Sequence, residues 1–487
     1  MTATGRREGI ILALAAAVLV MSPWQPRPEV ALAAPTMADG FLARGKIDTV
    51  VIVVMENRSF DNIFGGDTIF GHPTPFPSAT ALLPSEIAGL MTTAPFAPDS
   101  GEDNWHNEFA CLALGNFTSA QWKRVAQAPP SPCTTTAISP VVPSTQPFKY
   151  LEPRYRAIYH DIARKYTLGD AFFAVTSTDS YPAHQYIVAG QSVATYIDQS
   201  SNKTVVQIVG GQFSGGNGCV DARSTYPPYV TAPVLPTPQP SVAPTTAFTT
   251  LATTGLGGEC YDVPTFADAI LATQPAPISW GNFATVDDPG VFNGFHNIRR
   301  WWGMQWPASG SNVLFVAKNA ALPNFSWVKP PCVDASDHPN TGNGGPAWVR
   351  DLVNAIGSTS GKTHDQWSRT AIFVLWDDWG GFYDHVPPPP QRAWDNLGPG
   401  FRTPFLLISP YSRPGSVIHT PATYGSVLRF VEDLYGVPSL NTVDANSPDL
   451  TGYFDFASTP RPFNPITATS PESWQAACQF TTVLDHD

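Results

Sequence analysis

The sequence predicts an α/β protein with a doubly wound, mostly parallel sheet that is flanked by helices. Unbroken apolar runs indicate strands covered on both faces, because a strand with one solvent face would alternate apolar and polar residues. Segments with apolar residues three or four positions apart indicate helices between these strands. This alternation of strand and helix along the chain is typical of such a sheet. The hydrophobic content of 43% supplies its core.

Strands and helices are predicted at specific segments. The strongest strand candidates are residues 47–55, 370–376 and 403–409, and weaker ones are residues 278–283 and 325–328. Helices are predicted at residues 153–167, 345–357 and 423–436. The first helix has Pro153 in its first turn, and the other two end at Gly357 and Gly436, as the positional preferences of these residues favour.

The first 33 residues have the pattern of a secretory signal peptide. Arg6 and Arg7 precede the apolar stretch GIILALAAAVLVM, and the small residues Ala31 and Ala33 suit a cleavage site. The apolar stretch is short for a membrane span, and an uncleaved anchor is the alternative. The arginine pair is compatible with twin-arginine export and with the general secretory route. We expect a secreted, periplasmic or cell-surface protein whose residues 34–487 form a single domain.

The cysteines and the loops between them are expected to reflect export. Cysteines in an exported chain indicate disulfides. Cys111 with Cys133 and Cys219 with Cys260 would each close a local loop, which leaves Cys332 and Cys478, although other pairings are open. Pro- and Thr-rich tracts lie beside these cysteines, so we expect loop-rich insertions at about residues 95–150 and 200–260.

The charge of the chain excludes one class of function. The formal net charge is −12 at pH 7. A general nucleic-acid binder would present a basic face, so nucleic acid is not an expected partner.

Polar side chains stand where two of the predicted strands end. Glu56 and Asn57 follow the first strand, and Asp377 and Asp378 follow the strand at residues 370–376. In a doubly wound sheet, ligands bind beyond the carboxyl ends of the strands. Adjacent buried carboxylates repel each other unless a cation neutralises them, and oxygen ligands suit Mg²⁺, Mn²⁺ or Ca²⁺. The sequence therefore predicts a divalent metal site, with a solvated acidic loop as the alternative.

The segment DSYPAHQYIVAG contains a candidate nucleophile. Ser180 is predicted to lie in a turn of small residues, where a metal could lower the pKa of its hydroxyl. The alternative is an ordinary turn residue. No GxSxG motif occurs, which argues against an α/β-hydrolase. Histidines on other predicted strand-exit loops could supply a general acid or hydrogen bonds to a phosphoryl oxygen; they are His106, His338, His385 and His419.

A series of sequence blocks resembles the bacterial phosphoesterase family, which contains phospholipases C and acid phosphatase A. The blocks are VVIVVMENRSFDNIFG, DSYPAHQYIVAG, CYDVPTFADAI, ISW, LPNFSWVKPP, SDHP, PAWVRDLVNAIG, SRTAIFVLWDDWGGFYDHVPPP and GFRTPFLLISPYSRPGSVIHT. They follow the family's order over most of residues 47–436. The resemblance implies an alkaline-phosphatase-like fold with a metal at the carboxyl edge of the sheet.

The resemblance also implies roles for residues at matching positions. The implied metal ligands are Glu56, Asn57, Ser180, Asp377 and Asp378, and the implied ion is divalent Mg, Mn, Ca or Zn. Ser180 matches the nucleophile as well. The implied general acid or phosphate contact is His338, with His106 as a looser match. Further substrate-binding candidates are His184, His385 and Arg58, although Arg58 could instead pair with Asp61. Two positions depart from the family's pattern: Ala183 replaces an asparagine, and Trp379 replaces a histidine.

The expected function is that of an exported, metal-dependent phosphoesterase with a serine nucleophile, similar to acid phosphatase. The alternative is a phospholipase C that cleaves phosphatidylcholine-type lipids and touches a membrane surface transiently, for example through Trp301 and Trp302. The larger phospholipases C of the family carry C-terminal β domains, for which we expect no room here. An exported binding protein with an inactive site is the alternative from another class. The sequence leaves the metal, the oligomeric state and the physiological ester open.

Overall fold

The computed structural model describes the sheet, its helices and the strand-exit loops. The described residues are 39–65, 149–175, 180–191, 264–272, 278–284, 312–339, 343–386, 399–450 and 452–479, with short pieces at 68–69, 72–73, 92–94, 195–198, 203–206, 293–295, 298, 301 and 388–389. The predicted signal peptide and most of both predicted insertions lie outside these residues. Within the described part of the chain, no helix has the length and apolar character needed to cross a membrane.

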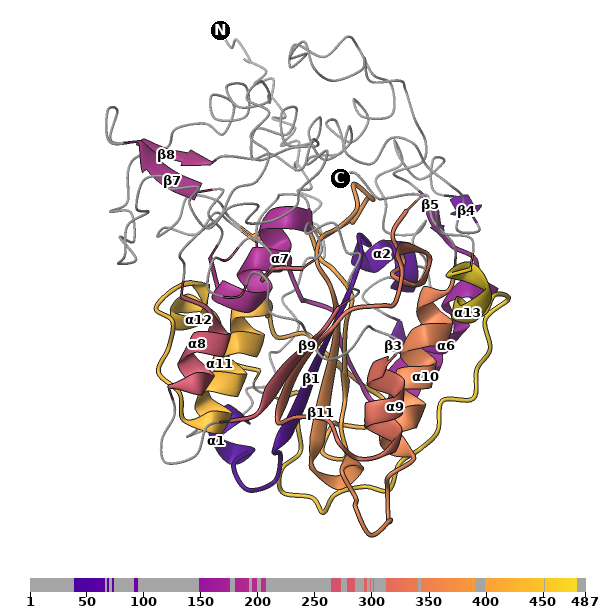
Figure 1. Ribbon diagram of the computed structural model, residues 1–487. Coiled ribbons are helices and arrows are strands. Elements are labelled where there is room, and N and C mark those ends of the chain that lie inside the picture. Colours follow the sequence, from indigo (N-terminus) through magenta and orange to yellow (C-terminus); the bar gives the residue numbers. More distant parts are fainter. Residues whose placement is uncertain are drawn as a thin grey trace, which may run out of the picture. The chain divides into compact units, whose positions relative to one another are not determined.

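A sheet forms the centre of the fold (Figure 1). It has seven strands in the order β13-β6-β12-β11-β1-β10-β9. Its strands are β1 (Thr49–Met55), β6 (Thr167–Gly169), β9 (Trp280–Phe283), β10 (Phe325–Val328), β11 (Thr370–Trp376), β12 (Phe405–Ile408) and β13 (Ser416–Ile418). β1 pairs in parallel with β10 and β11, whereas β12 pairs antiparallel with both of its neighbours. The predicted mostly parallel sheet is confirmed.

Helices cover both faces of this sheet (Figure 1). One face packs against α7 (Ser180–Ala189), α8 (Phe266–Leu271) and α11 (Tyr424–Tyr435). The other packs against α6 (Pro153–Lys165), α9 (Asn312–Lys318) and α10 (Gly345–Gly357). Short helices are α1 (Asp39–Leu42), α2 (Phe60–Phe64), η4 (Val333–Ala335), η5 (Trp367–Arg369), α12 (Val443–Asn446) and α13 (Trp474–Ala477). Two-stranded pairs are formed by β2 (Thr68–Ile69) with β3 (His72–Pro73), β4 (Thr92–Ala94) with β5 (Lys149–Leu151), and β7 (Thr195–Asp198) with β8 (Lys203–Val206).

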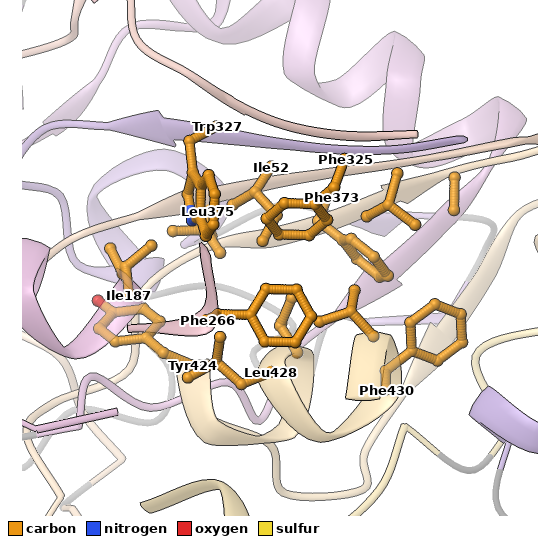
Figure 2. Packing of buried hydrophobic residues seen from close by; sticks show 14 of the residues in the cluster. Ile52, Ile187, Phe266, Phe325, Trp327, Phe373, Leu375, Tyr424, Leu428 and Phe430 are labelled. Atoms are coloured by element: carbon orange, nitrogen blue, oxygen red, sulfur yellow. The ribbon is translucent and has the colours of Figure 1, made fainter. Parts of the chain in front are cut away.

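The central strand β1 is buried along its whole length, which explains its unbroken apolar sequence. Val50, Ile52 and Val54 belong to the core on the α11 side. Val51, Val53 and Met55 belong to the core on the α10 side. Figure 2 shows Ile52 and its sheet neighbours Phe325 and Phe373 facing Tyr424, Leu428 and Phe430 of α11. Each such side chain contributes roughly 1.5–3 kcal/mol through burial, so both helical layers hold the strand in place.

The segment around Ser180 differs from its prediction. It was expected to be a turn, but Ser180 is the first residue of helix α7. Pro182 is tolerated in the first helical turn because no hydrogen bond from its nitrogen is needed there. Ala183, Tyr186 and Ile187 then pack into the core at helical spacing.

One disulfide lies within the described residues. Cys332, just before η4, is bonded to Cys478 at the end of α13, with their Cα atoms 5.7 Å apart. This is the pair left over by the predicted local pairing. The other four cysteines lie outside the described residues, so their pairing remains a prediction.

Candidate metal centre

The carboxyl ends of β1 and β11 bring the predicted carboxylates together. The two strands run in parallel register with Met55 opposite Trp376. The main-chain nitrogen of Asp377 donates to Met55 O over 3.0 Å, and that of Arg58 donates to Asp378 O over 3.1 Å. The side chains of the four ligands predicted at these two strand exits are buried; they are Glu56, Asn57, Asp377 and Asp378. These hydrogen bonds hold the two strand exits together as one site at the edge of the sheet.

Helix α7 brings Ser180 to the same site. The hydroxyl is fully buried, and its Oγ lies 2.9 Å from Asn57 Oδ1 and 3.1 Å from Asp378 Oδ2. Both distances are hydrogen-bond distances. The serine therefore contacts one predicted ligand from each strand exit.

His184 lies among the ligand candidates rather than apart from them. Its Nε2 is 3.1 Å from Glu56 Oε1 and 3.4 Å from Asp377 Oδ2. Glu56, His184 and Asp377 each offer a ligand atom within 4.8 Å of the others. Residues four apart on a helix share a face, so α7 presents Ser180 and His184 together. A helical reading of the segment would have revealed this pairing from the sequence.

The electrostatics of the cluster favour a bound cation. Burial, followed by the nearby Asp377 carboxylate, raises the pKa of Glu56 well above its ordinary value. Burial also opposes ionisation of Asp377, but the hydrogen bond and charge of His184 outweigh it and lower the pKa of Asp377. Glu56 Oε2 is buried without a hydrogen-bond partner among the described residues. Because buried oxygen atoms normally have partners, this donor set fits a divalent ion.

Backbone geometry fixes the ligands in these positions. Asn57 has a positive φ of 49°, which is uncommon for a residue other than glycine. Its main-chain nitrogen donates to Asp377 Oδ1 over 3.0 Å, and Gly380 N donates to Asp378 Oδ1 over 2.6 Å. Tyr424 of α11 donates its hydroxyl to the main-chain oxygens of Trp376 and Asp377. Hydrogen bonds from Asn57, Gly380 and Tyr424 thus fix the segment that follows β11.

Gly380→Ala is expected to disturb this centre more than a matched change elsewhere. Gly380 (φ 64°) and Gly361 (φ 71°) both have left-handed backbone, so alanine adds about 1 kcal/mol of strain at either position. A Cβ at Gly380 would also collide with Asn57 O, whereas one at Gly361 would meet no atom of the described residues within 4 Å. Calorimetric titration with Mn²⁺ should show weaker binding for Gly380→Ala only. Equal affinities for the two variants would contradict a role of this turn in positioning the ligands.

Lys329 is a member of the site that the sequence reasoning missed. It follows β10 directly, and its Nζ lies 3.9 Å from Glu56 Oε1 with the side chain 8% exposed. Its sequence signal is FSWVKPP, which places a cation at the exit of a predicted strand. The structure pairs this strand with β1.

His338 and Arg58 lie against the loop that follows β10. His338 is buried, and a charge on its ring would be felt by Glu56. Arg58 donates its Nε to the main-chain oxygen of Asp337 over 2.8 Å, and its guanidinium stacks 4.9 Å from the ring centroid of Phe382. Asp337 Oδ2 accepts hydrogen bonds from Tyr159 Oη and Trp376 Nε1.

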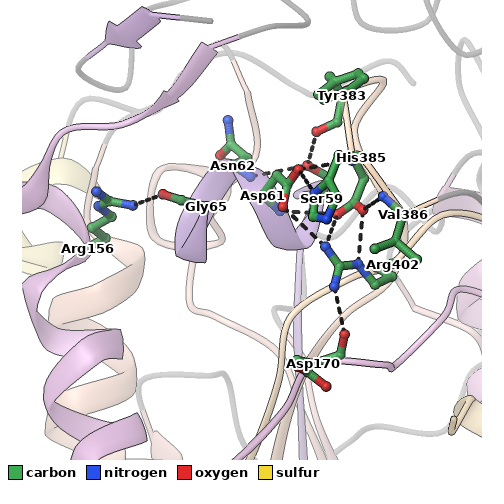
Figure 3. Close-up of polar contacts among 11 residues, drawn as sticks. Ser59, Asp61, Asn62, Gly65, Arg156, Asp170, Tyr383, His385, Val386 and Arg402 are labelled. Atoms are coloured by element: carbon green, nitrogen blue, oxygen red, sulfur yellow. Dashed lines mark hydrogen bonds and ion pairs between the residues drawn. The ribbon is translucent and has the colours of Figure 1, made fainter. Parts of the chain in front are cut away.

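A second buried network ties the two ligand-bearing loops to each other (Figure 3). Arg402 pairs with Asp61 Oδ1 at 3.2 Å and with Asp384 Oδ1 at 2.9 Å, and it donates to Asp170 O over 2.9 Å. His385 Nδ1 lies 2.6 Å from Asp61 Oδ2. His385, predicted to bind substrate, therefore belongs to this network, and Asp61 is paired with Arg402 and His385.

Burial dominates the titration of this second network. It raises the pKa of Asp61 and of Asp384 to about 6, although the Arg402 charge acts in the opposite direction. Burial, together with Arg402, lowers the pKa of His385 to about 2. His385 is therefore neutral at ordinary pH.

The remaining positions singled out in the sequence are His106, His419 and Trp379. His106 lies outside the described residues. His419 Nδ1 lies 2.7 Å from Asp170 Oδ2, with the histidine side chain 72% exposed. Trp379, which stands where the family often has histidine, is buried with its ring centroid 4.8 Å from that of Phe401.

The chain belongs to the Phosphoesterase family, whose model matches residues 47–261 and 296–438. The resemblance seen in the sequence blocks is thereby confirmed. The matched ranges contain both strand exits, Ser180, His184 and Lys329.

Relatives of the chain include phospholipases C. The chain is 26% identical to the non-hemolytic phospholipase C of Burkholderia pseudomallei over 524 residues, which cover 94% of this chain and 66% of that protein. It is 33% identical to phospholipase C B of Mycobacterium tuberculosis over 173 residues, or 30% of this chain and 32% of that one. The chain thus spans less than two-thirds of the length of these relatives.

Solved structures show weaker similarity. Murine ectonucleotide pyrophosphatase/phosphodiesterase 5 has 10% identity and a TM-score of 0.30 over 58% of this chain and 91% of its own. The lipoteichoic acid synthase LtaP from Listeria monocytogenes has 11% identity and a TM-score of 0.32 over 90% of this chain and 80% of its own.

Proposed function

We propose that this protein is a metal-dependent phosphoesterase that uses Ser180 as its nucleophile. The observation that carries the proposal is the buried contact of Ser180 Oγ with Asn57 and Asp378, beside two further carboxylates. A hydroxyl in such surroundings is suited to attack on phosphorus. Membership of the Phosphoesterase family supports the same reaction class.

The chain's own residues divide the work of a two-step displacement. Ser180 Oγ attacks phosphorus, so that the Oγ–P bond forms while the bond from phosphorus to the leaving oxygen breaks. Asp378 Oδ2, 3.1 Å from Oγ, is placed to accept the hydroxyl proton. His338 is our candidate donor of a proton to the leaving oxygen. Water then cleaves the Oγ–P bond and restores the serine.

The donor set is proposed to hold one divalent ion. Its ligands would be Glu56, Asn57, Ser180, Asp377 and Asp378, with His184 as a candidate sixth. When bound, such an ion supplies positive charge that lowers the pKa of the serine hydroxyl and stabilises the phosphoryl oxygens in the transition state. Six donors match the coordination number of Mg²⁺ or Mn²⁺.

We propose phospholipase C activity as the specific reaction. The named relatives are phospholipases C, which favours this alternative over the acid phosphatase expected from the sequence. Water would thus cleave phosphatidylcholine into diacylglycerol and phosphocholine. Residues 1–33 remain our proposed signal peptide, and residues 34–487 the proposed catalytic domain of an exported enzyme.

Substrate comparison and metal removal test this proposal. The protein should release more product from p-nitrophenyl phosphocholine and phosphatidylcholine vesicles than from p-nitrophenyl phosphate. Chelation should reduce the rate with every substrate by at least about a hundredfold, because the contribution of the metal ion to catalysis is lost. Added Mn²⁺ or Mg²⁺ should restore these rates. Preference for the monoester would favour the phosphatase instead. Activity that survives chelation would contradict the metal-dependent mechanism.

A further inference from the structure

The candidate metal centre carries more negative charge than one divalent ion neutralises. Glu56, Asp377 and Asp378 contribute three negative charges when ionised, whereas Asn57, Ser180 and a metal-ligating, hence neutral, His184 contribute none. One divalent ion therefore leaves a net charge of −1. A phosphate ester is itself an anion, and like charges repel strongly where water is excluded. A further cation beside a single-ion site of this composition would offset that charge.

Lys329 stands in the position where that cation is needed. Its main-chain nitrogen donates to Phe283 O over 2.9 Å, which fixes the residue at the end of β10. Its side chain is nearly buried, with Nζ 3.9 Å from Glu56 Oε1. Burying an ammonium group is costly unless a negative charge lies close to it. The Glu56 carboxylate supplies that charge.

Arg58 and Arg402 are also buried near the site, but their described contacts lie elsewhere. Arg58 Nε donates to Asp337 O over 2.8 Å. Arg402 is paired with Asp61 and Asp384. Lys329 Nζ, by contrast, lies 3.9 Å from Glu56 Oε1, so its charge acts on the ligand cluster.

We propose that Lys329 balances the charge of the metal centre so that an anionic phosphoryl group binds with a single divalent ion. The inference rests on the proposed function. It has a consequence that a merely structural lysine would not have. An ammonium group beside Glu56 repels the metal ion and attracts the phosphoryl oxygens, so its removal changes the two affinities in opposite directions.

Two binding measurements on Lys329→Met test this consequence. Mn²⁺ is titrated into chelator-treated protein, and inorganic phosphate is then titrated into the Mn²⁺-saturated protein. Mn²⁺ should bind about tenfold more tightly, because a like charge near the ion is gone. Phosphate should bind roughly tenfold to a hundredfold more weakly, because a charged partner of the anion is lost. Lys329→Arg, which keeps the charge, should stay close to wild type in both titrations.

Lys165→Met is the matched control, because it removes an ion-paired lysine from α6. Lys165 pairs with Asp161 at 2.8 Å, and its loss should change neither affinity. Weaker binding of both Mn²⁺ and phosphate by Lys329→Met would indicate a structural role and overturn the inference, as would unchanged phosphate binding. Lys329→Gln serves if the methionine variant does not fold. Unfolding of both neutral variants in saturating Mn²⁺ also counts against the inference, since the ion then satisfies the carboxylates.

The same titrations separate this inference from the proposed function. Wild-type protein that binds no divalent ion would refute the proposed function itself. Wild-type protein that binds Mn²⁺ and cleaves phosphate esters, while Lys329→Met shifts both affinities in the same direction, would refute the role of Lys329 alone.

Discussion

Ser180→Ala is expected to lower kcat for phosphate-ester hydrolysis by at least about 10⁴-fold, because removal of a nucleophile eliminates the covalent pathway. The change deletes a single oxygen atom from the first turn of α7, and the helix retains its packing through Ala183, Tyr186 and Ile187. The melting temperature should therefore stay within a few degrees of wild type. Loss of activity without loss of the fold is the expected combination.

A second buried serine provides the control for this result. Ser326 of β10 is fully buried, and its hydroxyl has no hydrogen-bond partner among the described residues. Ser326→Ala should leave the rate unchanged. Acid quenching of wild-type protein during turnover, followed by peptide mass spectrometry, should reveal a phosphoryl group on Ser180. Full activity of Ser180→Ala, or a phosphoryl group on another residue, would show that the nucleophile was assigned wrongly.

Local sequence patterns predicted the strands that carry the ligands. β1 and β11 have seven buried residues each, and after the threonine that begins each strand their sequences are apolar throughout. Their parallel pairing then places Glu56 and Asp377 at one edge of the sheet. The rule that ligands bind at the carboxyl ends of such strands made this edge predictable without a structure.

Contacts between distant segments were much harder to predict. Arg402 pairs with Asp61, 341 positions away, and nothing in either local sequence indicates this partner. His385 has the appearance of a site residue because it follows the two aspartates, yet its ring pairs with Asp61. Helix α7 was overlooked because Pro182 suggests a turn, although proline is acceptable in a first helical turn. The periodicity of a sequence indicates which of its residues are buried. Pairs such as Arg402–Asp61 depend instead on which distant elements pack together.

Arg402→Met is expected to destabilise the protein by about 3–5 kcal/mol at neutral pH, because it leaves buried carboxylates without their cation. Asp61 lies on α2, just after the first strand exit, and Asp384 lies in the loop after Asp378. Arg402 binds both, and it is anchored to Asp170 O (Figure 3). The variant should also bind Mn²⁺ more weakly, because the two ligand-bearing loops lose their connection. Urea denaturation and calorimetry measure the two effects.

Arg156 of α6 supplies a matched control, because it contacts the same helix α2. It is also buried, but it donates to the main-chain oxygens of Ile63 and Gly65 at the end of α2. Figure 3 shows the contact with Gly65. Arg156→Met should reduce stability by leaving those oxygens unsatisfied, with little change in Mn²⁺ affinity. Equal losses of Mn²⁺ affinity in both variants would mean that α2 as a whole, rather than the Arg402 bridge, positions the metal ligands.

The cost of Arg402→Met should grow as the pH rises. Burial raises the pKa of Asp61 and of Asp384 from 3.8 to about 6, so the folded state binds more protons than the unfolded state between these values. The stability contributed by these carboxyls is therefore present at low pH and falls as the pH rises through that window. The Arg402 charge opposes the rise in pKa, and without it proton uptake extends to higher pH. The destabilisation should accordingly be larger at pH 7 than at pH 5. The double variant Arg402→Met/Asp384→Asn should recover part of the lost stability. If the destabilisation by Arg402→Met did not depend on pH and the double variant recovered no stability, Arg402 would contribute through packing rather than through its charge.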